Sequence, residues 1–263
     1  MEIVVCIKRV PETDQVELAI TEDKRSIKED GLVFVLNEAD EYATEEAVLL
    51  KEKFGGSVTV VTVGKEEATQ QLRKCLAMGA DRAIRLDDER FAGSDGYVIA
   101  KLLCAAIKAL NFDLVLTGCI SSDDGYGQVG VQLAQLLGLP HATLVTGITE
   151  IDGKKARIRR ELESGLQEVI DVELPALLSV QTGINKPRYA SFRSIRESRD
   201  KEIKVLGLSD LGLNEDDVGE AGSKVKLEKL FVSLAGSRAE IIEGTAGETT
   251  GKLAEILKER GLI

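Results

Sequence analysis

The sequence predicts an α/β fold with a doubly wound, mostly parallel sheet, and three observations lead to this prediction. Short apolar runs rich in β-branched residues alternate with longer stretches in which apolar residues recur at helical spacing. The runs are apolar throughout, as expected of strands that are covered on both faces. Each run leads into a helical stretch, which is the order that builds a parallel sheet with helices on both sides.

The first elements of this pattern lie within the first 54 residues. Residues 2–8 (EIVVCIK) form an apolar run that predicts a central strand. Residues 16–20 and 31–36 predict a small hairpin around a charged segment. Asn37 is a suitable N-cap for a helix that runs to about residue 54. The residues expected on the inner face of that helix are Tyr42, Ala43, Ala47 and Leu50.

The alternation continues to residue 139. Residues 57–63 predict a strand, and Leu72, Cys75, Leu76 and Gly79 mark the apolar face of the next helix. A short strand at 83–86 and a helix at 95–110 follow. The apolar face of this second helix consists of Val98, Leu102, Leu103, Ala106 and Ile107. A strand at 113–116 then leads through a polar loop into a helix with Leu133, Leu136 and Leu137 at helical spacing.

The pattern changes after Pro140. Residues 143–150, 155–161 and 167–172 are separated by Asp-Gly and Ser-Gly turns and predict antiparallel strands, followed by a strand at 174–180. The segment 197–205 is helix-like, and a final helix is expected at 249–260. We therefore expect an α/β domain over residues 1–192 and a C-terminal arm over 193–263 that packs on a partner.

Composition and charge exclude several classes of protein. The net charge of -11 disfavours a nucleic-acid surface, because phosphate backbones reward clustered cations. No apolar run approaches the ~20 residues of a membrane span. The four cysteines occur singly, so we expect no metal site, and the lone His141 has no evident triad partners, so we expect no catalytic residue. Residues 1–8 lack the features of a secretory signal, and a cytoplasmic location is expected.

The loop between residues 117 and 130 is the candidate ligand site. Its glycines permit tight turns and close backbone approach, and serines and aspartates precede the helix. A strand, a hydroxyl-rich turn and a helix N-terminus together favour phosphate binding. The loop matches neither GxGxxG nor GxxxxGK[ST], so an ordinary strand-to-helix turn remains an alternative.

Several separate motifs resemble the beta subunit of electron transfer flavoprotein. They are VCIKRVP from Val5, EEAVLLKEK from Glu45, CLAMGADRAI from Cys75, DLVLTG followed by SSDDGYGQVGVQLAQLLGLP, and NKPRYASF from Asn185. The resemblance implies a nucleotide-binding domain of the adenine-nucleotide hydrolase-like type, paired with an alpha subunit that carries an FAD. It also implies that the beta subunit holds AMP with a structural role or, in the flavin-bifurcating branch, a second FAD that accepts a hydride from NADH.

The resemblance also implies particular site residues. The nucleotide pocket would comprise Cys6, Asn37, Glu38, Ala39, Asp40, Val63, Gly118, Cys119, Ser121, Ser122, Asp123, Asp124, Gly125, Tyr126, Gly127, Gln128, Val129 and Gly130. The segment that docks a flavin-dependent dehydrogenase would comprise Ile184, Asn185, Pro187, Arg188 and Tyr189. In the bifurcating branch, NADH and ferredoxin are further partners.

Details of the motifs favour the bifurcating branch, and with it FAD over AMP. The chain has Asn37-Glu38 where the housekeeping pattern has Asn-Pro, and it lacks the lysine run that follows Arg-Tyr-Ala in that pattern. Its Gln-Val-Gly at 128–130, its Ser-Phe-Arg at 191–193 and its Gly-x-Ala-Gly-Ser at 219–223 resemble the bifurcating branch more closely. Tyr126 stands where the bifurcating branch often has threonine. Two other classes stay open: a nucleotide-hydrolysing enzyme, although residues 8–13 read KRVPET instead of a Gly-rich loop, and an ATP-binding stress-type module.

Overall fold

The computed structural model of the protein describes residues 1–13, 16, 18–232, 239 and 241–263. The chain divides into two compact units. The larger unit comprises Met1–Ala19 and Lys28–Leu227, and the smaller one comprises Ile20–Ile27 and Glu228–Ile263. The larger unit contains every strand of the main sheet, so it carries the candidate site.

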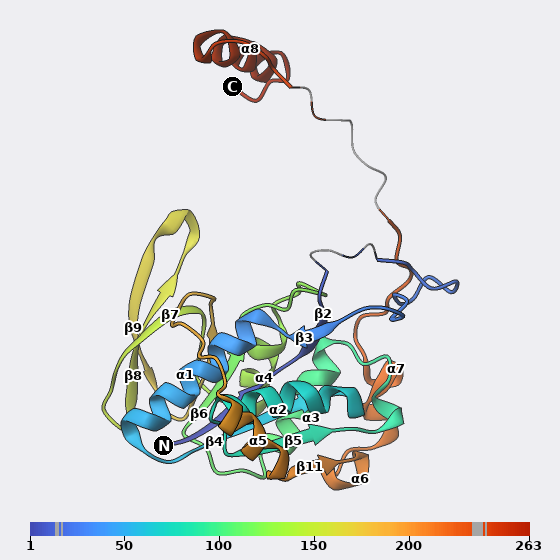
Figure 1. The fold of residues 1–263 in the computed structure, drawn as a ribbon, viewed down its shortest axis with the longest axis vertical. Coiled ribbons are helices and arrows are strands. Elements are labelled where there is room, and N and C mark those ends of the chain that lie inside the picture. The colour runs from blue at the N-terminus through green and yellow to red at the C-terminus, as the bar shows by residue number, and fades with distance from the viewer. Residues whose placement is uncertain (14–15, 17, 233–238, 240) are drawn as a thin grey trace. The chain divides into compact units, whose positions relative to one another are not determined.

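Among the described residues, the larger unit has a nine-stranded sheet with the order β11-β5-β4-β1-β6-β10-β7-β8-β9 (Figure 1). All neighbours from β11 to β7 are parallel, and β7, β8 and β9 are antiparallel. The strands are β1 (Glu2–Cys6), β4 (Ser57–Val63), β5 (Arg82–Leu86), β6 (Leu114–Gly118), β7 (His141–Ile151), β8 (Lys155–Glu161), β9 (Gln167–Glu173), β10 (Ala176–Val180) and β11 (Ile203–Leu206). The predicted fold class and the antiparallel region after Pro140 are confirmed.

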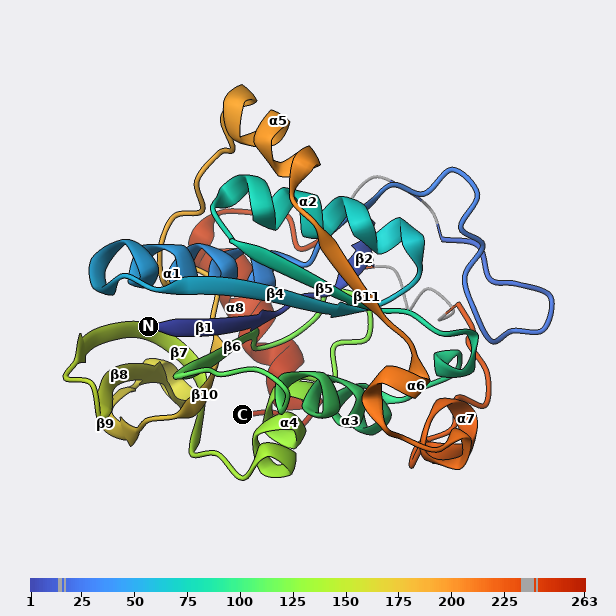
Figure 2. The same cartoon turned by 90° about the horizontal axis from the view of Figure 1, so that it is seen from below.

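Helices cover both faces of the sheet. Figure 2 shows α1, α2 and α5 on one side, with α3, α4, α6 and α7 on the other. The helices of the larger unit are α1 (Glu38–Phe54), α2 (Thr69–Met78), α3 (Gly96–Ile107), α4 (Val129–Leu137), α5 (Phe192–Asp200), α6 (Leu208–Leu211) and α7 (Gly219–Gly222). The first four lie close to the ranges predicted from apolar spacing, because their buried faces match that spacing.

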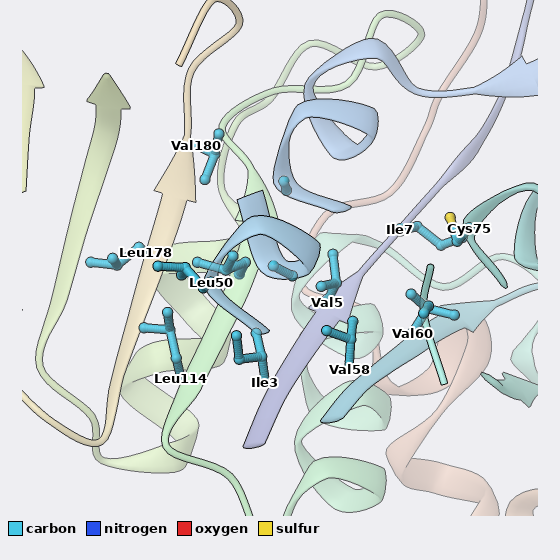
Figure 3. Close-up of a cluster of buried hydrophobic side chains, with 14 of the residues drawn as sticks. Ile3, Val5, Ile7, Leu50, Val58, Val60, Cys75, Leu114, Leu178 and Val180 are labelled. Atoms are coloured by element: carbon cyan, nitrogen blue, oxygen red, sulfur yellow. The ribbon is translucent and has the colours of Figure 1, made fainter. Parts of the chain in front are cut away.

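The core has two layers because successive residues of a strand point to opposite faces. Ile3 and Val5 of β1 belong to the cluster that also contains Leu50 of α1, whereas Val4 belongs to the cluster beneath α3 and α4. Figure 3 shows the first of these clusters, which gathers side chains from β1, β4, β6 and β10 around α1. Burying each such aliphatic side chain stabilises the fold by roughly 1.5–3 kcal/mol.

The predicted hairpin of residues 16–20 and 31–36 is wrong in its pairing. The strand β3 (Phe34–Leu36) pairs antiparallel with β2 (Arg9–Pro11). The Arg9 guanidinium lies over the Phe34 ring, 3.4 Å from its centroid, and the Glu12 N–H donates to Val33 O at 2.8 Å. These contacts favour β2, the strand that directly follows β1, as the partner of β3. Residue 17 of the expected partner strand lies outside the described part of the chain.

The helix-like segment 197–205 divides into the end of α5 and the edge strand β11, which pairs parallel with β5. The Arg73 guanidinium donates to Ser198 O and Lys201 O, and so satisfies carbonyls at the end of the helix. Residues Ile203–Leu206 then pair with the edge of β5 as a strand and do not continue the helix. Local spacing alone does not reveal this pairing. The compact unit that holds the sheet therefore extends beyond residue 192, to Leu227.

The smaller unit contains α8 (Ala246–Glu259), close to the helix predicted at 249–260. Its N-terminus has a capping box, in which the Glu248 carboxylate accepts from the Thr245 N–H at 2.8 Å. None of the helices within the described residues is long and apolar enough to cross a membrane.

Candidate functional site

The candidate site lies where the order of the strands reverses. From β1 the chain adds β4 and β5 on one side, and it then returns to place β6 on the other side of β1. In open α/β sheets, ligands bind beyond the carboxyl ends of the strands at this switch point. Here those ends are Cys6 of β1 and Gly118 of β6, so the loop predicted from its sequence emerges at the expected place.

Asp40 joins the two strands that flank the switch point. Its buried carboxylate accepts from the Lys8 N–H at 2.7 Å and from the Gly118 N–H at 2.9 Å. Burial raises the pKa of Asp40 to about 7, and the two backbone donors limit the rise. Asp40 therefore holds the ends of β1 and β6 against the first turn of α1.

Asn37 fixes the loop that follows β6. Its side-chain amide donates to Ile120 O at 2.9 Å, and its Oδ1 accepts from the Ser122 N–H at 3.2 Å. Its own N–H donates to Lys8 O at 3.0 Å. The predicted N-cap residue is thus buried beneath the loop and shapes it, while its side chain makes no capping hydrogen bond to α1.

Lys8 is a residue of the site that the sequence interpretation missed. Its ammonium group donates to Asp123 Oδ1 at 2.8 Å and to Asp124 Oδ2 at 2.6 Å, and Ser121 Oγ lies 3.5 Å away. These contacts raise the pKa of Lys8 against the effect of its burial. Burial alone would raise the pKa of Asp123, but the hydrogen bond and the charge of Lys8, together with bonds from the Asp124 N–H and Ser121, lower that pKa. The signal in the sequence that could have identified Lys8 is a cation directly after the first strand.

The glycines of the loop fall into two groups. A Cβ on Gly118 would overlap Asp40 Oδ1 and Ala39, and a Cβ on Gly130 would lie 2.6 Å from Ser179 Oγ and 2.7 Å from Thr117 Oγ1. These two glycines permit close packing of α1 and α4 on the sheet. Gly125 and Gly127 have positive φ values of 68° and 59° and make the turn itself.

The exposed part of the site consists of residues 122–127, which lead into the half-buried beginning of α4. The side chain of Gln128, the N-cap residue of α4, makes no capping hydrogen bond. The first N–H groups of a helix lack partners within it, and together with the helix dipole they favour an anion. Ser121 and Ser122 add hydroxyl groups to the same loop. Gln128, the residue before α4, packs against Gly96 at the start of α3.

The other predicted pocket residues lie along the same edge, with different exposure. Glu38 and Tyr126 are exposed, Ala39 is buried under Gly118, and Val63 ends β4. The Cys6 thiol is fully buried, and burial raises its pKa far above its ordinary range. In the part of the chain that the structure describes, no cluster of side chains suits a metal ion.

Two further polar pairs escaped the sequence interpretation. The buried hydroxyls of Thr117 and Ser179 lie 3.0 Å apart at the ends of β6 and β10. The Cys119 thiol donates to Gln181 Oε1 at 3.1 Å. The first pair joins β6 to β10 and the second joins the residues that directly follow these two strands. The strands are distant in sequence but adjacent in the sheet, so only the strand order could have indicated the pairs.

The predicted docking segment is tied to α1. The Arg188 guanidinium contacts Glu45 at 2.9 Å and Glu52 at 2.6 Å, and the Asn185 amide donates to Glu46 Oε2 at 2.9 Å. Beyond this anchor, the side chains of Tyr189 and Phe192 are 98% and 96% exposed. Arg188 is therefore an anchor, and the exposed aromatic rings are the groups free to meet a partner.

We expect Asp40 to make the free energy of unfolding fall as pH rises from about 4 to about 7. The pKa of Asp40 is about 7 in the fold against an ordinary value of 3.8, so the native state retains a proton that the unfolded chain has lost. Relative to Asp40→Asn, the wild type should lose about 3 kcal/mol between pH 4.5 and pH 7. Urea unfolding at both pH values measures this difference. Equal pH dependence in the two proteins would contradict it.

Comparison with known proteins gives consistent matches over most of the chain. The family model described as electron transfer flavoprotein domain matches residues 25–211. Electron transfer flavoprotein subunit beta of Methylophilus methylotrophus is 40% identical over 262 residues, which cover 98% of each chain. The subunit of the same name from Bacillus subtilis is 36% identical, with 100% of each chain covered. Caffeyl-CoA reductase-Etf complex subunit CarD of Acetobacterium woodii is 38% identical, also with 100% of each chain covered.

Proposed function

Because the chain belongs to the electron transfer flavoprotein family, as a beta subunit, we propose that it binds an adenine nucleotide at the loop between β6 and α4. Members of this family serve in electron transfer and pair with an alpha subunit. The nucleotide that we favour is FAD, with AMP as the alternative. In the favoured case, the chain takes part in electron transfer through a flavin of its own.

The observation that carries this proposal is the N-terminus of α4, where Gln128 makes no capping hydrogen bond, next to an exposed glycine loop at the switch point of the sheet. A Cβ at Gly125 would meet nothing within 4 Å, so the backbone there is open to a ligand. Residues 127–129 are the segment that we expect to hold phosphate through backbone N–H groups. The Ser121 and Ser122 hydroxyls are further donors. This donor set fits the phosphate part of FAD and of AMP equally well.

The protein's part in the chemistry is to bind and orient the cofactor. A bound flavin supplies one-electron and two-electron transfer, whereas the chain supplies position and electrostatic environment. The Asp40 carboxylate and the Asn37 amide hold the loop from below through their bonds to Gly118, Ile120 and Ser122. They fix where the phosphates lie, and the phosphates in turn fix the remainder of the nucleotide.

The preference for FAD rests on the motifs that resemble the bifurcating branch. A relative whose name places it in a caffeyl-CoA reductase-Etf complex adds support. We propose that the chain works in such an assembly, with NADH as electron donor, a flavin-dependent dehydrogenase or reductase as one partner and ferredoxin as another acceptor. The AMP alternative is favoured by Tyr126, which stands where the bifurcating branch often has threonine.

Two surfaces are proposed for partner proteins. The C-terminal arm, which we placed at residues 193–263, is proposed to pack on the alpha subunit, with the part beyond Leu227 as its main contact. The segment 184–189, together with the exposed Phe192, is proposed to dock the dehydrogenase. The support is the anchoring of this segment by Arg188 and the exposure of its aromatic rings.

The class of function is tested by purifying the chain with its alpha partner and recording the flavin absorbance of the complex. We expect a yellow heterodimer that NADH or a reduced dehydrogenase bleaches. A colourless heterodimer that added FAD does not restore would exclude the electron-carrier proposal. Turnover of ATP by the isolated chain would favour the nucleotide-hydrolysing alternative instead.

A further inference from the structure

The candidate phosphate loop carries two acidic side chains that are unfavourable for binding an anion. Asp123 and Asp124 lie between the serines and the glycines of the loop, and both are at least partly exposed. An ionised carboxylate near a phosphate raises the free energy of the complex, because the two like charges repel at short range. A phosphate site on this loop therefore requires a feature that offsets these charges.

Lys8 supplies that feature from a different part of the chain. Its ammonium group lies 2.8 Å from Asp123 Oδ1 and 2.6 Å from Asp124 Oδ2, so one cation contacts both carboxylates. The main chain of Lys8 is held separately, by its N–H bond to Asp40 at 2.7 Å and by the Asn37 N–H at 3.0 Å. The ammonium group is thus presented from a fixed backbone position.

We propose that Lys8 is a positioning residue that determines the affinity of the loop for phosphate by holding the carboxylates of Asp123 and Asp124. This inference rests on the proposed nucleotide site and deepens it. By pairing with both carboxylates, Lys8 keeps them directed toward the end of β1 and reduces their negative field at the start of α4. The ligand class is a nucleotide with at least one phosphate, and the effect acts on the phosphate alone.

If Lys8 had a purely structural role, replacing it would lower the stability of the fold, and the effect would not depend on the phosphate of the ligand. We expect the opposite. The Lys8 side chain is 40% exposed, and ion pairs at such positions add little to stability. The backbone hydrogen bonds of Lys8 do not depend on its side chain, so Lys8→Met should leave the fold and its melting temperature nearly unchanged. The effect that we infer should appear in binding, and only for ligands that carry a phosphate.

The experiment compares AMP with adenosine as ligands of the heterodimer after its nucleotides have been removed. For the wild type we expect AMP to bind more tightly than adenosine, because only AMP reaches the N-terminus of α4. For Lys8→Met we expect the dissociation constant of AMP to rise about tenfold or more, whereas that of adenosine changes less than about threefold. Calorimetric titration measures both constants.

Lys74→Met is the matched control. Lys74 is 43% exposed and pairs with Glu41 at 2.7 Å, but it lies on α2, away from the loop. This variant should bind AMP as the wild type does. The triple variant Lys8→Met, Asp123→Asn, Asp124→Asn removes the carboxylates together with their cation, so it should recover the affinity for AMP to within about threefold of the wild type.

The outcomes separate this inference from the proposed function. A wild-type complex that binds neither AMP nor FAD in this subunit would refute the nucleotide site itself. If the wild type binds AMP and Lys8→Met binds it equally well, or weakens AMP and adenosine alike, the role of Lys8 is refuted. Weaker binding of AMP that the triple variant does not recover would also overturn the inference, because Lys8 would then act on the phosphate directly.

Discussion

Gly118→Ala should lower the free energy of unfolding by about 3 kcal/mol. The added Cβ would overlap the Asp40 carboxylate and the Ala39 side chain, which lie in the first turn of α1 directly above the end of β6. Moving Asp40 away would break its bonds to the N–H groups of Gly118 and Lys8. Both the packing of α1 and the position of the loop depend on these bonds. The variant should therefore lose bound nucleotide together with stability.

Urea unfolding of the purified chain measures this effect, and Gly251→Ala is the control. Gly251 lies in α8, and a Cβ there would meet nothing within 4 Å. That change should stabilise α8 slightly, by up to about 1 kcal/mol, because alanine favours helix more than glycine does. A loss of less than about 1 kcal/mol for Gly118→Ala would show that α1 can move away from the end of β6 at little cost.

Arg188→Met should destabilise the fold by about 2 kcal/mol and weaken the docking of a dehydrogenase that we propose for this segment. The Glu45 side chain is only 3% exposed, and the Arg188 guanidinium, which is 32% exposed, is the cation that contacts it. Removing the guanidinium leaves a buried carboxylate without its cation, with only the N–H of residue 188 still donating to it, and the penalty is reduced because one side of the pair is open to water. Segment 184–189 would also lose its anchor on α1. Thermal unfolding and the KM for the dehydrogenase measure the two effects.

Two further variants test this interpretation of Arg188. In the double variant Arg188→Met, Glu45→Gln, the buried charge is gone, so more than half of the lost stability should return. Arg193 is 88% exposed and pairs with Glu197 one turn later in α5, so Arg193→Met should change stability by less than about 0.5 kcal/mol. Equal losses for Arg188→Met and Arg193→Met would show that burial of Glu45 contributes nothing.

The sequence predicted the elements whose signal is local. The strand at 57–63 and the helix that ends at Phe54 agree with the structure because β-branched runs and apolar spacing depend on neighbouring residues alone. The N-cap prediction is wrong in its contact, since the Asn37 side chain binds the loop and does not cap the helix. The pairing of β3 with β2 and the formation of β11 at the edge of the sheet depend on contacts between distant segments. Those contacts leave no periodic pattern, so local interpretation missed them.

The candidate site was also predictable only in part. The glycines, the serines and the helix start identified the loop, and the structure places it at the switch point of the sheet. The part that Lys8 plays was not predictable, because its partners lie more than 110 residues along the chain, at Asp123 and Asp124. The sequence also does not separate the two roles of glycine: Gly130 permits packing on Thr117 and Ser179, whereas Gly127 adopts a positive φ.

The most direct test is to count the nucleotides of the purified complex. The chain is expressed with its alpha subunit, the complex is denatured, and the released FAD and AMP are quantified per heterodimer. We expect two FAD and no AMP, with the second FAD held by the loop between β6 and α4. One FAD and one AMP would contradict the choice of FAD and assign the chain a structural nucleotide. One FAD with no AMP would contradict the nucleotide site itself.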